Sequence, residues 1–132
     1  LHGIGRRQRQ MCIRDRHAEG YPAGEMKHGP LALIEEGLPV IVIAPKDKYY
    51  EKTLSNMQEV MARGGKILFI TNHKKELMNE NIRLGIRVPS IDNLLSPILL
   101  TIPIQLLAYH VALLKGCDID KPRNLAKSVT VE

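Results

Sequence analysis

The 132-residue sequence contains few aromatic residues: four tyrosines, one phenylalanine and no tryptophan. A surface that binds single-stranded nucleic acid by stacking needs several exposed aromatic rings, so this composition argues against such a surface. Hydrophobic residues make up 44% of the chain, and most of them are aliphatic. A chain of this length buries roughly two thirds of the surface that its unfolded form exposes. The composition therefore indicates one domain with an aliphatic core.

Cysteine is also scarce, with only Cys12 and Cys117 in the chain. The two residues form no C-x-x-C pair, so the sequence offers neither a disulfide framework nor a typical zinc site. The first residues lack the charged and then apolar order of a secretory signal peptide. We therefore predict no metal, no cofactor and a cytoplasmic location.

Positive charge is concentrated at the start of the chain. Residues 1–16 contain five arginines and one acidic residue, Asp15, so they carry a net charge of +4 out of the chain's +5. An arginine-rich arm can bind phosphate backbones, but no apolar period places these arginines on one face. We favour a segment foreign to the domain that follows, either artefactual or disordered. We accordingly predict no nucleic-acid partner and a domain that spans residues 17–132.

The middle of the chain shows the pattern of a parallel α/β sheet. Residues 39–45, PVIVIAP, form a short β-branched run of the kind that is buried on both faces of such a sheet. Residues 47–65 follow with apolar positions at helical spacing and end in Gly64 and Gly65, which predict a C-cap. A second buried strand, KILFIT, completes a strand, helix, strand unit. The fold class is therefore α/β, with helices that flank a parallel sheet.

The second half is predicted with less regular elements. Residues 72–85 are polar and indicate a short helix or loop, and residues 86–90 indicate a third, shorter strand. A long helix is expected over residues 91–115, with Asp92 as its N-cap and Gly116 as its C-cap. Pro103 should kink or split this helix.

Residues 93–114 raise the question of a membrane. They contain no formally charged side chain and are long enough to span a bilayer. However, polar residues and two prolines interrupt the run, and each polar group would need a partner in lipid. We favour a buried helix and predict no membrane interaction.

Three stretches carry a resemblance to a known family: AGEMKHGPLALI at 23–34, LPVIVIAP at 38–45 and IPIQLLAYHVALLKGCDIDKPRNLAKSVTVE at 102–132. They resemble the glutamine:fructose-6-phosphate aminotransferase (isomerising) family, also called glucosamine-6-phosphate synthases. The resemblance runs from His17 to Glu132 and corresponds to the second sugar isomerase (SIS) domain of that family. It implies a flavodoxin-like, or Rossmann-like, parallel sheet and a catalytic C-terminal tail at 117–132.

The resemblance also implies a chemistry. In this family a glutaminase domain releases ammonia, and two SIS domains use it to convert fructose 6-phosphate into glucosamine 6-phosphate. Lys127 would form a Schiff base with the open-chain sugar, and the backbone around Ala126 would contact the sugar. His28 would help to open the sugar ring and would reach the site from the adjacent subunit of a homodimer. The implied partners are thus a phosphosugar and a second copy of the chain.

The residues themselves are compatible with these roles but do not select them. A lysine attacks a carbonyl only when its amine is neutral, so desolvation by Leu125, Ala126 and Val129 would favour Lys127 as a nucleophile. Imidazole exchanges protons near neutral pH, which suits ring opening by His28. By composition alone, Lys127 would be a surface lysine and His28 a loop residue. We expect Glu25 and Lys27 to shape the loop or to form ion pairs.

The chain lacks several parts that the family uses. It contains no glutaminase domain and no first SIS domain with its phosphate-binding loop, and Cys12 stands where the family has a catalytic carboxylate. We therefore expect a C-terminal fragment that is inactive in isolation and whose long helix exposes apolar surface. The alternatives are a non-catalytic SIS module that senses phosphosugars or dimerises, and a plain phosphosugar isomerase.

Overall fold

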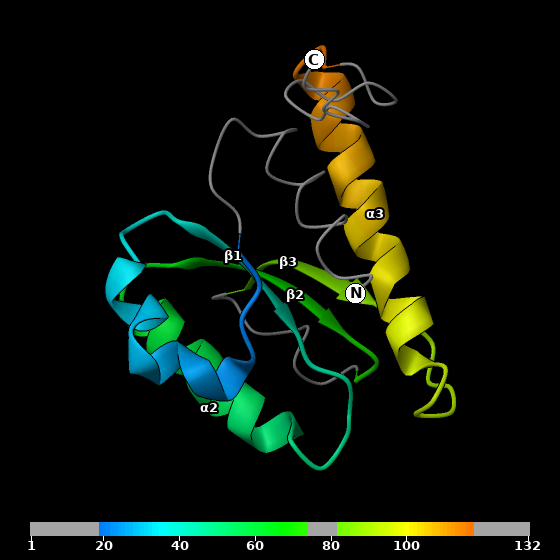
Figure 1. Cartoon of the computed structure of the whole chain (residues 1–132), viewed down its shortest axis with the longest axis horizontal. Helices are drawn as coiled ribbons and strands as arrows, with labels where there is room; N and C mark the ends of the chain where they lie inside the picture. Colours follow the sequence, from blue (N-terminus) through cyan, green and yellow to red (C-terminus); the bar gives the residue numbers. More distant parts are fainter. Residues whose placement is uncertain (1–18, 74–81, 118–132) are drawn as a thin grey trace, which may run out of the picture. The chain divides into compact units, whose positions relative to one another are not determined.

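The computed structural model describes residues 19–73 and 82–117. Its elements, shown in Figure 1, are η1 (Ala23–His28), η2 (Pro30–Leu33), β1 (Pro39–Ile43), α2 (Tyr50–Ala62), β2 (Lys66–Thr71), β3 (Ile82–Arg87) and α3 (Ser96–Leu114). The chain divides into two compact units, with boundaries after Gly20 and after Pro103. The first unit, Tyr21–Pro103, contains the whole sheet.

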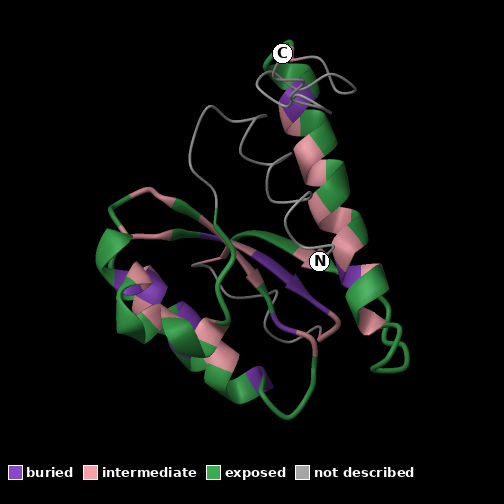
Figure 2. Ribbon diagram, in the orientation of Figure 1, coloured by how far each residue is buried: buried purple, intermediate pink, exposed green. Residues whose placement is uncertain are grey.

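In the described part of the chain, the sheet has three parallel strands in the order β1-β2-β3. Pro39 pairs with Lys66 at one end of the β1–β2 ladder, and Ile43 pairs with Ile70 at the other. The parallel α/β prediction is therefore confirmed. Strand β2 is almost completely buried, as Figure 2 shows, whereas β1 is only partly buried. The prediction that β1 is buried on both faces was wrong because β1 is an outer strand of this sheet.

Strand β3 starts earlier in the chain than the sequence pattern suggested. It begins at Ile82 and ends at Arg87, so residues 82–85 are strand and not part of a helix or loop. Arg83, Leu84, Gly85 and Arg87 are all exposed. The outer position of β3 explains the weak signal, because most of its side chains need not be apolar.

The core of the first unit lies between α2, the short helices and the sheet. It consists of apolar residues from η2, the residue after β1, α2 and β2: Leu31, Ala44, Tyr50, Met57, Val60, Ile67 and Phe69. Met57 and Val60 lie on one face of α2, as the helical period predicted. Burying an aliphatic side chain of this size contributes about 1.5–3 kcal/mol. This packing therefore fixes α2 against the sheet.

Helix α2 ends in the C-cap that the glycine pair predicted. The backbone N–H of Gly65 donates to the carbonyl of Val60 at 3.1 Å, and that of Gly64 donates to the carbonyl of Met61 at 2.9 Å. These two bonds define a Schellman motif. Gly64 has a φ of +81°, which side chains other than that of glycine adopt at a cost.

We expect Gly64→Ala to lower the free energy of unfolding by about 1–2 kcal/mol, since alanine disfavours the left-handed conformation. A Cβ at this position would also lie 3.0 Å from the Cα of Glu36. Urea unfolding of the 132-residue chain measures the effect as a lower midpoint with an unchanged slope. Gly24→Ala is the matched control, because a Cβ there meets nothing within 4 Å. An equal midpoint shift for both variants would contradict the expectation.

Helix α3 is preceded and ended by the residues predicted as its caps. The Asp92 carboxylate accepts a hydrogen bond from the backbone N–H of Leu94 at 2.8 Å in the turn that leads into the helix. At the other end, the N–H of Cys117 donates to the carbonyl of Ala112 at 3.0 Å around Gly116. Pro103 lies inside the helix and does not split it, contrary to one of the two outcomes expected.

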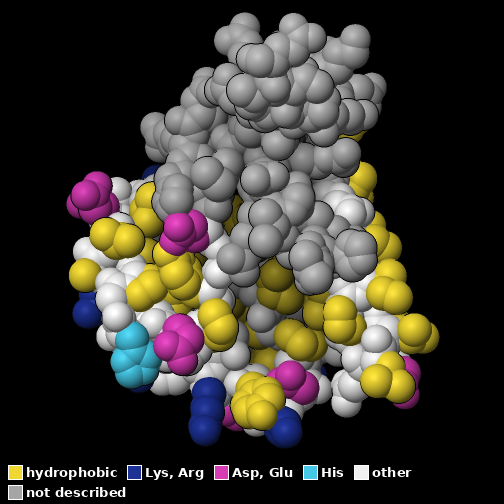
Figure 3. All heavy atoms as spheres, in the orientation of Figure 1, with side chains coloured by type: hydrophobic (Ala, Val, Ile, Leu, Met, Phe, Trp, Pro, Cys, Tyr) yellow, Lys and Arg dark blue, Asp and Glu magenta, His cyan; other side chains and the backbone are white. Residues whose placement is uncertain are grey.

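The apolar surface of α3 is largely exposed in this chain. Its exposed large hydrophobic residues include Ile98 (67%), Ile102 (47%), Leu106 (54%), Tyr109 (44%) and Leu113 (50%). Figure 3 shows hydrophobic side chains along α3. The prediction of a buried helix is therefore not met within the described residues. By length and composition alone, α3 is also the one described helix that could cross a membrane.

Candidate functional site

His28 lies at the end of η1, and its side chain is exposed. Helix η1 starts after Pro22, whose carbonyl accepts a hydrogen bond from the N–H of Glu25 at 2.9 Å. Gly29 follows with a φ of +143°, a conformation that favours glycine. The chain then turns into η2, where Leu31 is buried in the core. The sequence KHGP thus forms a defined turn with His28 on the surface.

Two polar contacts attach η1 to α2. The side-chain amide of Asn56 donates to the carbonyl of Ala23 at 2.9 Å, and the Nζ of Lys27 lies 2.8 Å from the Oε1 of Glu59. Met26, which lies between Ala23 and Lys27 in the sequence, packs against the core. The ion pair confirms the expectation for Lys27, which is paired and structural.

The two contacts differ in strength. Asn56 is only 8% exposed, so removing its donor would leave a poorly solvated partner and cost about 1–3 kcal/mol. The side chains of Lys27 and Glu59 are 52% and 35% exposed, and pairs of this kind contribute less than about 1 kcal/mol. Asn56 therefore supplies most of the attachment energy, and the ion pair mainly limits the orientation of η1.

The sequence reasoning did not identify Asn56 or Glu59. One signal was present, because Asn56 stands next to Met57 within the buried part of α2. A polar residue at a buried helix position usually has a specific hydrogen-bond partner. The partner itself could not be named, since it lies 33 residues away.

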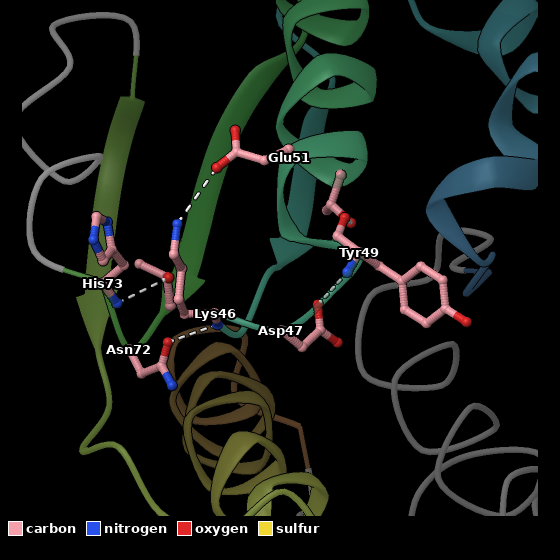
Figure 4. Close-up of polar contacts among 8 residues, drawn as sticks. Lys46, Asp47, Tyr49, Glu51, Asn72 and His73 are labelled. Atoms are coloured by element: carbon pink, nitrogen blue, oxygen red, sulfur yellow. Dashed lines mark hydrogen bonds and ion pairs between the residues drawn. The ribbon is translucent and has the colours of Figure 1, made fainter.

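The carboxyl ends of β1 and β2 form a second polar region, drawn in Figure 4. The backbone N–H of Lys46 donates to Oδ1 of Asn72 at 2.8 Å, which joins the loops that follow the two strands. The carboxylate of Asp47 accepts from the N–H of Tyr49 at 2.8 Å and closes the turn before α2. This edge of a parallel sheet is where α/β proteins commonly bind ligands.

The side chains in this region contact one another. The Nζ of Lys46 lies 3.4 Å from Oε1 of Glu51 and 4.5 Å from the centre of the Tyr50 ring. The His73 ring meets the Tyr50 ring edge-on at 5.6 Å. Across residues 19–73 and 82–117, no three His, Cys, Asp or Glu side chains form a group that could hold a metal ion. The side chains of Lys46 and His73 thus both contact the first turn of α2.

The other predicted site residues lie outside the described residues. These are Ala126, Lys127 and the part of the tail from 118 to 132, together with Cys12 and the segment 1–16. Of the tail, the structure describes only Cys117, which is partly buried. The roles of Lys127 and Ala126 stay predictions, as does the contribution of His28 across a subunit interface.

The parallel sheet with helices packed against it defines an α/β protein. The sequence model of the SIS domain family matches residues 8–115, and the chain belongs to this family. The match confirms the predicted fold class. It starts inside residues 1–16, the segment that was set apart on its charge, and that segment is not among the described residues.

Individual proteins of known name are similar to this chain over most of its length. The chain is 60% identical over 117 residues to the glutamine–fructose-6-phosphate aminotransferase [isomerizing] of Agrobacterium fabrum and, equally, to that of Brucella abortus. Each match covers 88% of this chain and 19% of the relative, so the chain spans about a fifth of their length. A solved structure, the C-terminal domain of glucosamine-fructose-6-phosphate aminotransferase from Francisella tularensis, is 42% identical with a TM-score of 0.80. That match covers 89% of this chain and 33% of the solved chain.

Proposed function

We propose that this chain is the C-terminal sugar-isomerase part of an enzyme that converts fructose 6-phosphate and glutamine into glucosamine 6-phosphate and glutamate. The observation that carries the proposal is the 60% identity to aminotransferases of this name over 88% of the chain. The exposed position of His28 on a turn fixed to α2 supports it. The substrate of the site would be a phosphosugar.

Two side chains would perform the chemistry that belongs to this segment. Ring opening removes a proton from the anomeric hydroxyl and adds one to the ring oxygen as the C2–O bond breaks, and the His28 imidazole can serve both transfers near neutral pH. The neutral amine of Lys127 would then add to the C2 carbonyl and lose water to give an imine. The backbone at Ala126 would hold the sugar beside it.

The proposal includes a homodimer in which His28 acts on the site of the partner subunit. The exposed side chain of His28 fits this arrangement, because a residue that serves another chain must lie at the surface. Fixing its turn in advance lowers the entropy that would be lost on assembly.

The test is a chimera in which this chain replaces the matching segment of the Agrobacterium fabrum aminotransferase. We expect the chimera to form glucosamine 6-phosphate from fructose 6-phosphate and glutamine, as measured by a coupled product assay. We expect the 132-residue chain alone to form none, with glutamine or ammonia, since it spans 19% of that relative. A folded chimera without synthase activity, or an active isolated chain, would contradict the respective expectation.

A further inference from the structure

The face of α2 that meets η1 holds both ends of the short helix that carries His28. Asn56 contacts Ala23, the first residue of η1, and Glu59 contacts Lys27, the residue next to His28. Residues three apart on an α-helix lie on the same face. The two tethers are thus presented by one rigid surface, since α2 is itself fixed by Met57 and Val60 in the core.

We infer that Asn56 and Glu59 are positioning residues for His28. The inference rests on the proposed catalytic role of His28. One tether would restrain the place of η1 but allow it to rotate about the contact, whereas tethers at both ends restrain place and direction. The Lys27–Glu59 pair is exposed, and exposed pairs add little stability. The Lys27–Glu59 pair, which lies beside His28, therefore affects the orientation of the imidazole more than the stability of the fold.

Gly29 completes the arrangement on the other side of His28. Its φ of +143° fixes where the chain turns, and the carbonyl of Gly29 accepts a hydrogen bond from the N–H of Ala32 at 2.9 Å. His28 is therefore held between an ion pair at the residue before it and a turn at the residue after it. A small displacement of a proton-transfer group costs rate strongly, so loosening either α2 tether should slow ring opening.

The experiment is a double-mutant cycle in the complete chimeric aminotransferase. We expect Asn56→Asp, which replaces the donor with a carboxylate, to lower the kcat of synthesis about tenfold, and Glu59→Gln about threefold, with little change in the KM for fructose 6-phosphate. In a His28→Gln background, neither substitution should lower kcat further, because the residue that they position is gone. Thermal melting of each variant checks that it folds.

Rescue and control variants separate positioning from packing. The exchange Lys27→Glu with Glu59→Lys restores the ion pair and should recover most of the activity lost in Glu59→Gln. Glu51→Gln removes the other ion pair of α2, which contacts Lys46 and not η1, and should leave kcat unchanged. If Asn56→Asp fails to fold, Glu59→Gln and the charge exchange still decide the question, since Glu59 lies at the surface.

Two results would overturn the inference in distinguishable ways. If His28→Gln lowers kcat but both α2 variants leave it unchanged, or lower it equally with and without His28, then Asn56 and Glu59 do not position the imidazole and the proposed function stands. If His28→Gln itself leaves kcat unchanged, the catalytic role proposed for His28 fails and the inference fails with it.

Discussion

Replacing Lys127 with alanine should abolish synthesis of glucosamine 6-phosphate by the complete chimeric aminotransferase, with a loss of about a thousandfold or more. The reason is that an imine between the sugar and the enzyme needs an amine, and alanine supplies none. Glutamine hydrolysis by the same variant should continue, since the family resemblance assigns it to a different domain. The measurement is therefore the ratio of the two activities, which also shows that the variant is folded.

Arginine at the same position separates a nucleophile from a fixed positive charge. An arginine side chain stays protonated in proteins and cannot attack a carbonyl, so Lys127→Arg should be as inactive as Lys127→Ala. Borohydride reduction with fructose 6-phosphate present should attach the sugar covalently to Lys127 in the unsubstituted enzyme, as detected by peptide mass. Lys48→Ala, at an exposed lysine before α2, is the matched control and should remain active.

The outcome decides between the proposed enzyme and a non-catalytic SIS module. If Lys127→Ala leaves turnover intact, the segment does not carry the imine, and a role in phosphosugar sensing or dimerisation becomes the better account. If Lys127→Arg retains activity while Lys127→Ala does not, the lysine acts as a cation that holds the sugar phosphate.

The sequence predicted best the elements that bury apolar side chains at a regular period. Helix α2 was recognised because apolar residues such as Met57 and Val60 recur at helical spacing, and strand β2 because KILFIT is a short, mostly apolar run. The glycines that end α2 were recognised from a local rule, since the left-handed residue that follows a helix is usually glycine.

The parts that sequence reasoning missed depend on neighbours that lie far away in the chain. The partial exposure of β1 follows from its outer place in the sheet, which no local pattern records. The start of β3 was missed because Arg83 and Gly85 lie at exposed positions, so its pattern is not that of a buried strand. The tether between Asn56 and Ala23 joins α2 to η1 across 33 residues.

The candidate site shows the same division. His28 and Lys127 came from a resemblance, since a lone histidine or a terminal lysine does not by itself indicate catalysis. The structure added the contacts around His28 that fix its turn, whereas Lys127 is outside the described residues. The composition of α3 predicted a long apolar helix. Because this helix is apolar on all faces, its hydrophobic period could not show which face packs against another element.

The isolated 132-residue chain should self-associate through one face of α3. Ile98, Ile102, Leu106, Tyr109 and Leu113 are exposed and follow one another at intervals of three or four residues, which places them in one stripe. The helix contains no acidic, lysine or arginine side chain to oppose contact between two copies. A second copy of the chain presents the same apolar stripe and can cover it. We therefore expect antiparallel or parallel pairing of two α3 helices.

The expected affinity follows from the number of apolar side chains that two copies of the chain can bury. Each half-exposed aliphatic side chain gains about 1 kcal/mol on burial, and two stripes of five such residues gain about 10 kcal/mol. Association costs about 4–6 kcal/mol in lost motion, at the low end of its range, which leaves about 4–6 kcal/mol and a dissociation constant between about 40 μM and 1 mM. Sedimentation velocity over this concentration range should show a monomer–dimer equilibrium.

Leu106→Lys places a charge in the middle of the stripe and should shift the chain to monomer at all of these concentrations, because a buried unpaired ammonium is costly. Leu114→Lys is the matched control: it makes the same change at an exposed position of the same helix that is not three or four residues from any member of the stripe, and it should leave association unchanged. Equal effects of the two lysines would show that net charge, not the stripe, controls association. Co-sedimentation of the chain with neutral lipid vesicles, lost in Leu106→Lys, would instead favour a membrane-bound helix, since a single, largely apolar helix of 19 residues is long enough to enter a bilayer.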